Sequence, residues 1–147
     1  MSPVRSSVDF VGDPGTFLEA SRQRIVAWQR GSDGSGSQVA RLYTAAVDNT
    51  LCTLHHRLAE KAPDRWLREE FCLVAVGGYG RKSLCPHSDV DLLLLTASPA
   101  EDRLAEVAQG LLYPLWDARL STGQHPGTPA EILSRAEGDL HLQTALL

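Results

Sequence analysis

The sequence of 147 residues is poor in cysteine, which argues against a disulfide-stabilised protein and against a zinc-binding protein. Its three cysteines, Cys52, Cys72 and Cys85, are scattered and show no C-x-x-C spacing. An odd number of scattered cysteines is typical neither of a disulfide framework nor of a zinc site. We therefore expect these side chains to be small buried groups of a protein in a reducing compartment.

Long apolar runs and an excess of basic residues are also missing. The longest aliphatic run, Leu92 to Leu95, is far shorter than the ~20 residues of a membrane helix. The first ten residues contain no apolar core of signal-peptide length. The net charge is -4, whereas nucleic-acid-binding proteins usually carry a basic surplus. The composition predicts a cytoplasmic protein without a membrane or nucleic-acid partner, although a local site could still hold a charged ligand.

The first part of the chain has the pattern of two helices. Apolar residues recur at helical spacing over 38–61, and a helix is also expected over 15–30. The intervening GSDGSGS, residues 31–37, has the composition of a flexible linker. We therefore divide the chain into an N-terminal helical extension with its linker, 1–37, and a main domain, 38–147.

The main domain mixes strands with helices. The apolar runs 71–76 and 89–96 predict buried strands, and their lack of a polar face suits central positions in a covered sheet. A third strand is expected over 117–122. Further helices are expected as follows: a short one capped by Asp64, one from near Pro99, one from Pro129 after the capping sequence Thr-Pro-Ala-Glu, and one in the last nine residues. The fold class predicted is α/β (α+β), with a small mixed sheet covered by helices. The last helical pattern ends without a stop signal, so we expect a C-terminally truncated piece of a longer protein.

The stretch VGGYGRKSLCPHSDVDLLLL, residues 76–95, carries the chemistry. In a strand, Asp89 and Asp91 point to the same face, with Val90 turned into the core between them. Two such carboxylates repel each other, and the strand offers no Lys or Arg beside them. A divalent cation would relieve the repulsion, and Mg²⁺ typically binds one or two carboxylates together with phosphate oxygens of a nucleotide.

The glycines supply the second half of the predicted site. Gly77 and Gly78 directly follow the first strand, and a backbone without Cβ atoms can bring its N–H groups close to a phosphate. Arg81 adds a fixed positive charge suited to the same ligand. The stretch therefore predicts a place for a metal-bound nucleotide.

Other interpretations of this stretch fit less well. A dinucleotide-binding fingerprint needs a third glycine where Ser83 stands, and no helix pattern opens there. A Walker-type loop needs Gly-Lys-Ser/Thr, which is absent. Taken singly, the glycines could form a plain turn and Asp89 could cap a turn after Ser88. The complete string at this spacing favours the nucleotide site.

The apolar-Gly-Gly sequence, followed after ten residues by Asp-x-Asp, resembles the DNA-polymerase-β-like nucleotidyltransferase superfamily. More narrowly, residues 75–95 resemble the catalytic motif of the bacterial PII-protein uridylyltransferases, with Pro86, Ser88, Asp89, Asp91 and the leucines matching by position. LLYPLWDARL and DLHLQTALL resemble later segments of that family more weakly. The resemblance covers about residues 15–147.

This resemblance implies a function and a role for each matching residue. It implies a Mg²⁺-dependent, two-metal transfer of UMP from UTP to a tyrosine of the PII nitrogen-regulatory protein. Asp89 and Asp91 would hold the metal, and Gly77, Gly78 and Arg81 would position the triphosphate. Ser88 would donate a hydrogen bond to a phosphate.

Several positions depart from the family pattern. Lys82-Ser83 replaces a small or acidic pair, and GQHPGT at 123–128 has Gly127 where the family has arginine, with a proline inside the expected strand. That strand should therefore be bent or absent. The third carboxylate of the superfamily has only Asp117 as a candidate, by position alone.

Two other functions stay open beside the transferase. One is a degenerate domain that binds nucleotide or a partner without turnover, and the other keeps the fold but changes the acceptor. None of the five histidines is followed by aspartate, so no uridylyl-removing activity is expected from this chain.

Overall fold

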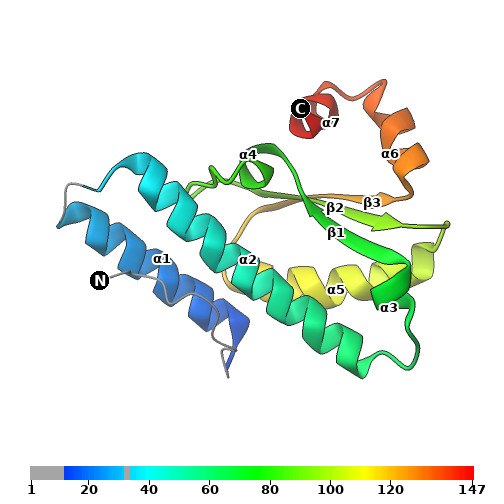
Figure 1. Ribbon diagram of the computed structural model, residues 1–147, viewed down its shortest axis with the longest axis horizontal. Coiled ribbons are helices and arrows are strands. Elements are labelled where there is room, and N and C mark those ends of the chain that lie inside the picture. The colour runs from blue at the N-terminus through cyan, green and yellow to red at the C-terminus, as the bar shows by residue number, and fades with distance from the viewer. Residues whose placement is uncertain (1–11, 32–33) are drawn as a thin grey trace.

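The computed structural model describes residues 12–31 and 34–147, and it confirms a mixed α/β fold with a helical N-terminal part (Figure 1). The first eleven residues of the predicted extension and residues 32 and 33 of the predicted linker lie outside the described residues. The elements are α1 (Pro14–Arg30), α2 (Gly36–Lys61), α3 (Trp66–Glu69), β1 (Phe71–Ala75), α4 (Gly77–Gly80), β2 (Val90–Thr96), α5 (Glu101–Asp117), β3 (Thr122–Gly127), α6 (Pro129–Ala136) and α7 (Leu140–Leu146).

The three strands form one mixed sheet in the order β1-β2-β3. β1 runs antiparallel to β2, with Ala75 opposite Leu92, and β3 runs parallel to β2, with Gly123 opposite Asp91. Only β2 is central, so the prediction of a central position is confirmed for 89–96 and wrong for 71–76. β1 is an edge strand of the described sheet, and its Cys72 side chain is exposed.

The predicted third strand at 117–122 is wrong, because the strand lies at 122–127 and includes Pro126. The expectation that proline would bend or remove this strand is also wrong. β3 pairs with β2 alone, so its other side needs no ladder donor, and a proline is tolerated at such an edge. Residues 118–121 lead the chain out of α5 instead, with Arg119 in the left-handed region at a φ of 58°.

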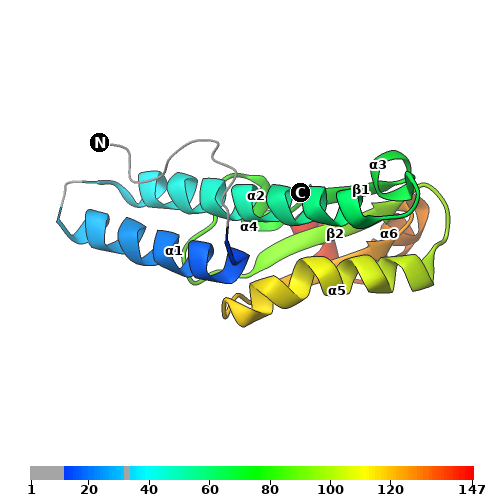
Figure 2. The ribbon, with the colours of Figure 1, turned by 90° about the horizontal axis from the view of Figure 1, so that it is seen from below.

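Helices cover the two faces of the sheet unequally (Figures 1 and 2). On one face the main core joins Val90, Leu92 and Leu94 of β2 to the buried sides of α1, α2 and α5. On the other face a smaller cluster joins Val76 and Leu93 to α6 and α7 through Ile132, Ala136 and Leu142. Asp91 alternates with Leu92, so it belongs to the face of the smaller cluster.

Side chains cap the starts of α1, α2, α6 and α7, whereas α3, α4 and α5 have no side-chain cap. Thr128 and Glu131 form the predicted capping box at the start of α6. The prediction that Asp64 caps the short helix is wrong by one position, because the N-cap of α3 is Arg65 without a side-chain cap; Asp64 still accepts a hydrogen bond from the backbone N–H of Trp66 at 3.1 Å. α2 begins inside the predicted linker, because the Ser35 side chain accepts from the N–H of Gln38 and the Gln38 side chain accepts from the N–H of Ser35.

All three cysteines are exposed, so the prediction of buried thiols is wrong. Their neighbours in sequence explain the error, because each lies beside a residue that takes the buried position instead, such as Leu51 beside Cys52 and Leu84 beside Cys85. Within the described ranges, no helix combines the length and the apolar character needed to cross a membrane.

Candidate functional site

The glycine-rich segment leaves β1 through a single tight helical turn. Val76 donates its backbone N–H to the carbonyl of Asp91 at 3.0 Å, so the pairing with β2 continues up to the start of the turn. Gly77 then adopts a φ of +60°, a conformation that favours glycine, and Gly80 closes the turn by donating to the carbonyl of Val76 at 2.9 Å. The expectation that no helix opens here is wrong, although α4 is only four residues long.

The carboxylate of Asp91 lies between two glycines, one in the turn after β1 and one in β3. A Cβ atom on Gly77 would lie 2.9 Å from one carboxylate oxygen, and a Cβ on Gly123 would collide with the other. Gly123 faces Asp91 because it is its partner in the parallel β2–β3 register. The position of Asp91 therefore depends on the absence of side chains at both glycines.

Four of the predicted residues line one open pocket, which we call the acidic pocket. It has a volume of about 390 Å³. Gly78, Ser88, Asp89 and Asp91 line it together with Ser83, Leu84 and His87. Gly77 is buried against Asp91 beside the pocket, whereas Arg81 is exposed and lines a separate hollow. The structure thus brings the glycines, the serine and both carboxylates together. The positively charged Arg81 side chain belongs to the neighbouring hollow.

Electrostatic repulsion acts inside the acidic pocket. The pKa of Asp91 is raised above its ordinary value by burial and then by the charge of Asp89, while His125 acts in the opposite sense. This is the environment expected of a carboxylate pair that a cation would stabilise.

The donor set fits a hard divalent cation such as Mg²⁺. Within the described ranges, no group of three His, Cys, Asp or Glu side chains could hold a metal ion. Asp89 and Asp91 would thus supply two carboxylates, and the remaining ligands would come from substrate phosphates and water. Mg²⁺ commonly binds in this way, whereas a structural zinc site needs a closed set of protein ligands.

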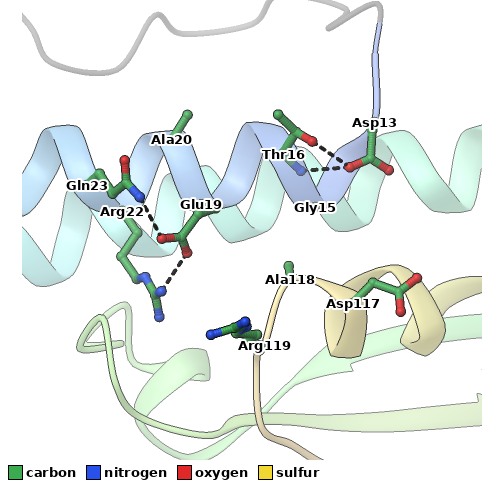
Figure 3. A pocket seen from close by; sticks show the side chains of 10 residues that line it. All are labelled: Asp13, Gly15, Thr16, Glu19, Ala20, Arg22, Gln23, Asp117, Ala118 and Arg119. Atoms are coloured by element: carbon green, nitrogen blue, oxygen red, sulfur yellow. Dashed lines mark hydrogen bonds and ion pairs between the residues drawn. The ribbon is translucent and has the colours of Figure 1, made fainter.

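Asp117 does not join the two carboxylates. It is exposed at the end of α5 and lines a hollow of about 490 Å³ between that end and α1, with Glu19, Arg22 and Arg119 nearby (Figure 3). In this hollow Glu19 pairs with Arg22 at 2.5 Å, and Asp13 caps α1 by accepting from Thr16. The candidacy of Asp117 as a third carboxylate of the acidic pocket is therefore wrong.

Two side chains near the site were not found from the sequence. Tyr79 of α4 is buried and donates its hydroxyl proton to Asp48 of α2 at 2.7 Å, which ties the glycine turn to the longest helix. Burial, followed by that hydrogen bond, raises the pKa of Tyr79. No local pattern predicts this contact, because Asp48 and Tyr79 are 31 residues apart.

His125 is the second residue that the sequence analysis missed. It lies two positions after Gly123 on β3, so its side chain shares the face of Asp91, where its charge opposes the rise in the pKa of Asp91. Only the parallel register of β3 against β2 reveals it, because the strand predicted over 117–122 ends before His125.

A small mixed sheet thus brings a glycine turn and an Asp-x-Asp pair into one pocket, which is the arrangement expected from the resemblance to nucleotidyltransferases. In comparisons with known proteins, no family model and no solved structure matches the chain. Curated proteins named bifunctional uridylyltransferase/uridylyl-removing enzyme do match it. The one from Novosphingobium aromaticivorans is 31% identical over 133 residues, which are 88% of this chain and 15% of the relative.

Two further relatives carry the same name. The Cereibacter sphaeroides protein is 40% identical over 106 residues, covering 72% of this chain and 11% of the relative. The Chromobacterium violaceum protein is 34% identical over 130 residues, covering 88% and 14% respectively. By sequence the chain belongs to this uridylyltransferase/uridylyl-removing enzyme family, and it spans about 15% or less of the length of these relatives.

Proposed function

We propose that this chain is the nucleotidyltransferase part of a PII-protein uridylyltransferase, which moves UMP from UTP to a tyrosine of the PII protein with Mg²⁺. The observation that carries the proposal is the acidic pocket, where Asp89, Asp91 and the glycine turn meet. The similarity to proteins named uridylyltransferase supports the choice of uridine over other bases. UTP and the PII protein are intracellular, so the proposal includes a cytoplasmic location.

The proposed reaction exchanges a phosphoanhydride bond of UTP for a phosphodiester bond to the tyrosine. The tyrosyl oxygen forms a bond to the α-phosphorus as the bond from that phosphorus to the bridging oxygen of the β-phosphate breaks. Pyrophosphate leaves with the electron pair, and the tyrosyl proton passes to solvent. Mg²⁺, when bound, would neutralise negative charge that develops on the phosphate oxygens.

Each residue of the chain has a distinct part in this proposal. Asp89 and Asp91 hold the metal in the acidic pocket. Gly77 and Gly78 leave room for the backbone of the turn to approach the phosphates, and the Ser88 hydroxyl donates to a phosphate oxygen. We propose that residues 38–147 carry this site and that residues 1–37 are an extension, of which α1 packs into the main core.

A second function is supported by one specific observation. The part of the chain that the structure describes brings no third carboxylate into the acidic pocket. A domain of this kind could bind Mg²⁺ and nucleotide without transferring UMP. Only a turnover measurement separates this binding function from the transferase.

The deciding experiment measures nucleotide binding first and transfer second. Calorimetry with UTP, ATP, CTP and GTP, with and without Mg²⁺, is expected to show Mg²⁺-dependent binding that prefers UTP. Asp89→Asn and Asp91→Asn should abolish it. The matched control is Asp117→Asn, which removes an exposed carboxylate from a different hollow and should leave binding unchanged.

Transfer is then tested with labelled UTP and a PII protein as acceptor. Labelling of a tyrosine that both Asp variants lose would establish the transferase, and binding without labelling would establish the second function. If the folded wild-type chain binds no nucleotide with Mg²⁺, or if either Asp variant binds UTP as the wild type does, the assignment of the acidic pocket is wrong.

A further inference from the structure

A second hollow beside the acidic pocket gathers positive charge, and we call it the basic hollow. It has a volume of about 360 Å³ and is formed by the first turns of α2 and the loop after α4. Its lining residues are Gly36, Ser37, Ala40, Arg41, Arg81, Lys82, Ser83 and Cys85. Arg81 was expected from the sequence to contact a triphosphate, whereas nothing in the sequence analysis pointed to Arg41.

The charge of the basic hollow contrasts with that of the chain. The protein as a whole has a net charge of -4, yet the three ionised side chains lining this hollow are all cations. None of the three forms an ion pair with a carboxylate of the described residues. The start of the 26-residue helix α2 adds the positive end of its dipole. This combination suits a polyanion.

The two walls of the basic hollow are held together by buried hydrogen bonds. The N–H of Leu84, in the loop, donates to the Thr44 hydroxyl of α2 at 3.3 Å, and that hydroxyl donates to the carbonyl of Ala40 at 2.8 Å. The Tyr79–Asp48 hydrogen bond ties α4, which precedes this loop, to the same helix. The cations therefore project from a preorganised frame, which reduces the entropy lost when an anion binds.

The basic hollow and the acidic pocket are neighbours. Ser83 lines both, and its N–H donates to the carbonyl of Gly78, a second lining residue of the acidic pocket, at 2.9 Å. The two sites therefore meet at the segment that carries Ser83, so an extended anion bound in the acidic pocket would end close to the basic hollow.

We propose that the basic hollow binds the β- and γ-phosphates of the nucleotide, with Arg41 and Lys82 acting beside Arg81. This inference rests on the proposed function. The α-phosphate must lie at the acidic pocket, where the metal balances the carboxylates. The remaining phosphates carry most of the nucleotide's charge, and three cations without carboxylate partners lie next to them. These two phosphates leave together as pyrophosphate, so the hollow also holds the product that must depart.

The first test compares nucleotides that have or lack the terminal phosphates. Arg41→Gln and Lys82→Gln should each weaken Mg²⁺-dependent UTP binding roughly three- to tenfold, as expected for a charge-assisted contact at an exposed site. Neither should change the affinity for UMP, which has no β- or γ-phosphate. Arg24→Gln is the matched control, because Arg24 is an exposed helical arginine of α1 that does not line the hollow.

The second test uses the cysteines of the unmodified chain as reporters. Cys85 lines the basic hollow, whereas Cys52 and Cys72 line a different hollow between α2 and β1. All three are exposed. Inorganic pyrophosphate should slow the alkylation of Cys85, followed by peptide mass spectrometry, and leave the rates at Cys52 and Cys72 unchanged. The protection should be weaker in Arg41→Gln.

The outcomes separate this inference from the proposed function. If UTP binds in a manner that depends on Asp89 and Asp91 but Arg41→Gln and Lys82→Gln bind it as the wild type does, the basic hollow is wrong and the function stands. If pyrophosphate protects Cys85 but the Asp variants bind UTP normally, the metal site is wrong and the hollow stands. If the wild-type chain binds neither UTP nor pyrophosphate, both are wrong.

Discussion

Asp91 is closely confined and bears an electrostatic cost. Its carboxylate lies against Gly77 and Gly123, and its pKa is raised by burial and by the charge of Asp89. A carboxylate so placed destabilises the fold when no cation is present, and perturbed titration of this kind is common at functional sites. This cost can be measured, and it gives a test that needs no substrate.

We predict that Asp91→Asn stabilises the metal-free protein at neutral pH. The native pKa of Asp91 lies above its unfolded value of 3.8, so ionisation destabilises the fold progressively as the pH rises from 3.8 through the native pKa, and the full loss is reached above it. The gain from the substitution should therefore be largest at neutral pH and shrink as the pH falls toward 3.8. Urea unfolding at several pH values measures it, and Asp117→Asn is the control. If Asp91→Asn were less stable than the wild type at pH 7, the proposed repulsion between Asp91 and Asp89 would be contradicted.

We predict that Gly123→Ala damages the site without disrupting the sheet. A methyl group there would collide with the Asp91 carboxylate and displace it from the acidic pocket. Mg²⁺-dependent UTP affinity should fall by roughly tenfold or more, the scale seen when groups that orient metal ligands are changed. Gly138→Ala is the control, because a Cβ at Gly138 meets no atom within 4 Å. Unaltered UTP binding in Gly123→Ala would show that Asp91 does not need this position.

At the scale of elements, the four-residue helix α4 depends on an anchor outside itself. The side chain of Tyr79 reaches across to Asp48 of α2, and its own helix is too short to be stable alone. The Gly77–Gly80 turn is therefore held in place by a tertiary contact as well as by its own hydrogen bonds. This explains why a sequence with three glycines in four positions keeps a defined conformation.

We predict that Tyr79→Phe loosens the turn and costs about 1–3 kcal/mol, since it leaves the Asp48 carboxylate without its donor. Thermal unfolding measures the stability, and hydrogen exchange of residues 77–84 measures the loosening.

Because the native pKa of Tyr79 lies above its unfolded value of 10.0, wild-type stability should also fall as the pH rises above that value. The variant should lose part of this alkaline dependence. Tyr113→Phe, at an exposed tyrosine of α5, is the control. Equal hydrogen exchange of residues 77–84 in Tyr79→Phe and in the wild type would show that the Tyr79–Asp48 hydrogen bond does not hold the turn.

The elements that the sequence predicted correctly are those specified by neighbouring residues. The apolar runs before Gly77 and after Asp89 form strands, the Thr128–Glu131 capping box starts a helix, and the alternation of a strand places Asp91 on one face. The grouping of Gly78, Ser88, Asp89 and Asp91 in one pocket follows from the same short stretch of chain. Local patterns were sufficient there because one connection links β1 to β2.

The errors concern features that depend on distant parts of the chain. Pro126 was expected to bend or abolish its strand, but an edge position in the sheet removes the penalty. Arg41 and Arg81 line one hollow although 40 positions separate them, and His125 faces Asp91 only through the strand register. The exposure of the cysteines likewise depends on which side of α2 and β1 meets the core. None of these relations has a short-range signal.

At the scale of the whole molecule, the N-terminal helix belongs to the same core as the site. Leu18 and Ile25 of α1 are buried in the main cluster with Tyr43 and Val47 of α2. α2 in turn carries Arg41, Thr44 and Asp48, which line the basic hollow or hold the loop and the glycine turn. Loss of α1 packing should therefore reach the site through α2.

We predict that Ile25→Ala costs about 2–5 kcal/mol of unfolding free energy, because the side chain is 0% exposed and its removal leaves a cavity between α1 and α2. Urea unfolding measures this cost, and Arg24→Ala, at the exposed neighbouring position, should change stability little. The same variant decides whether the extension matters to the site. If α1 braces α2, Ile25→Ala should increase hydrogen exchange in residues 40–48 as well as in α1 itself. Exchange that increases in α1 alone would mean that the extension folds onto the domain without supporting the nucleotide site.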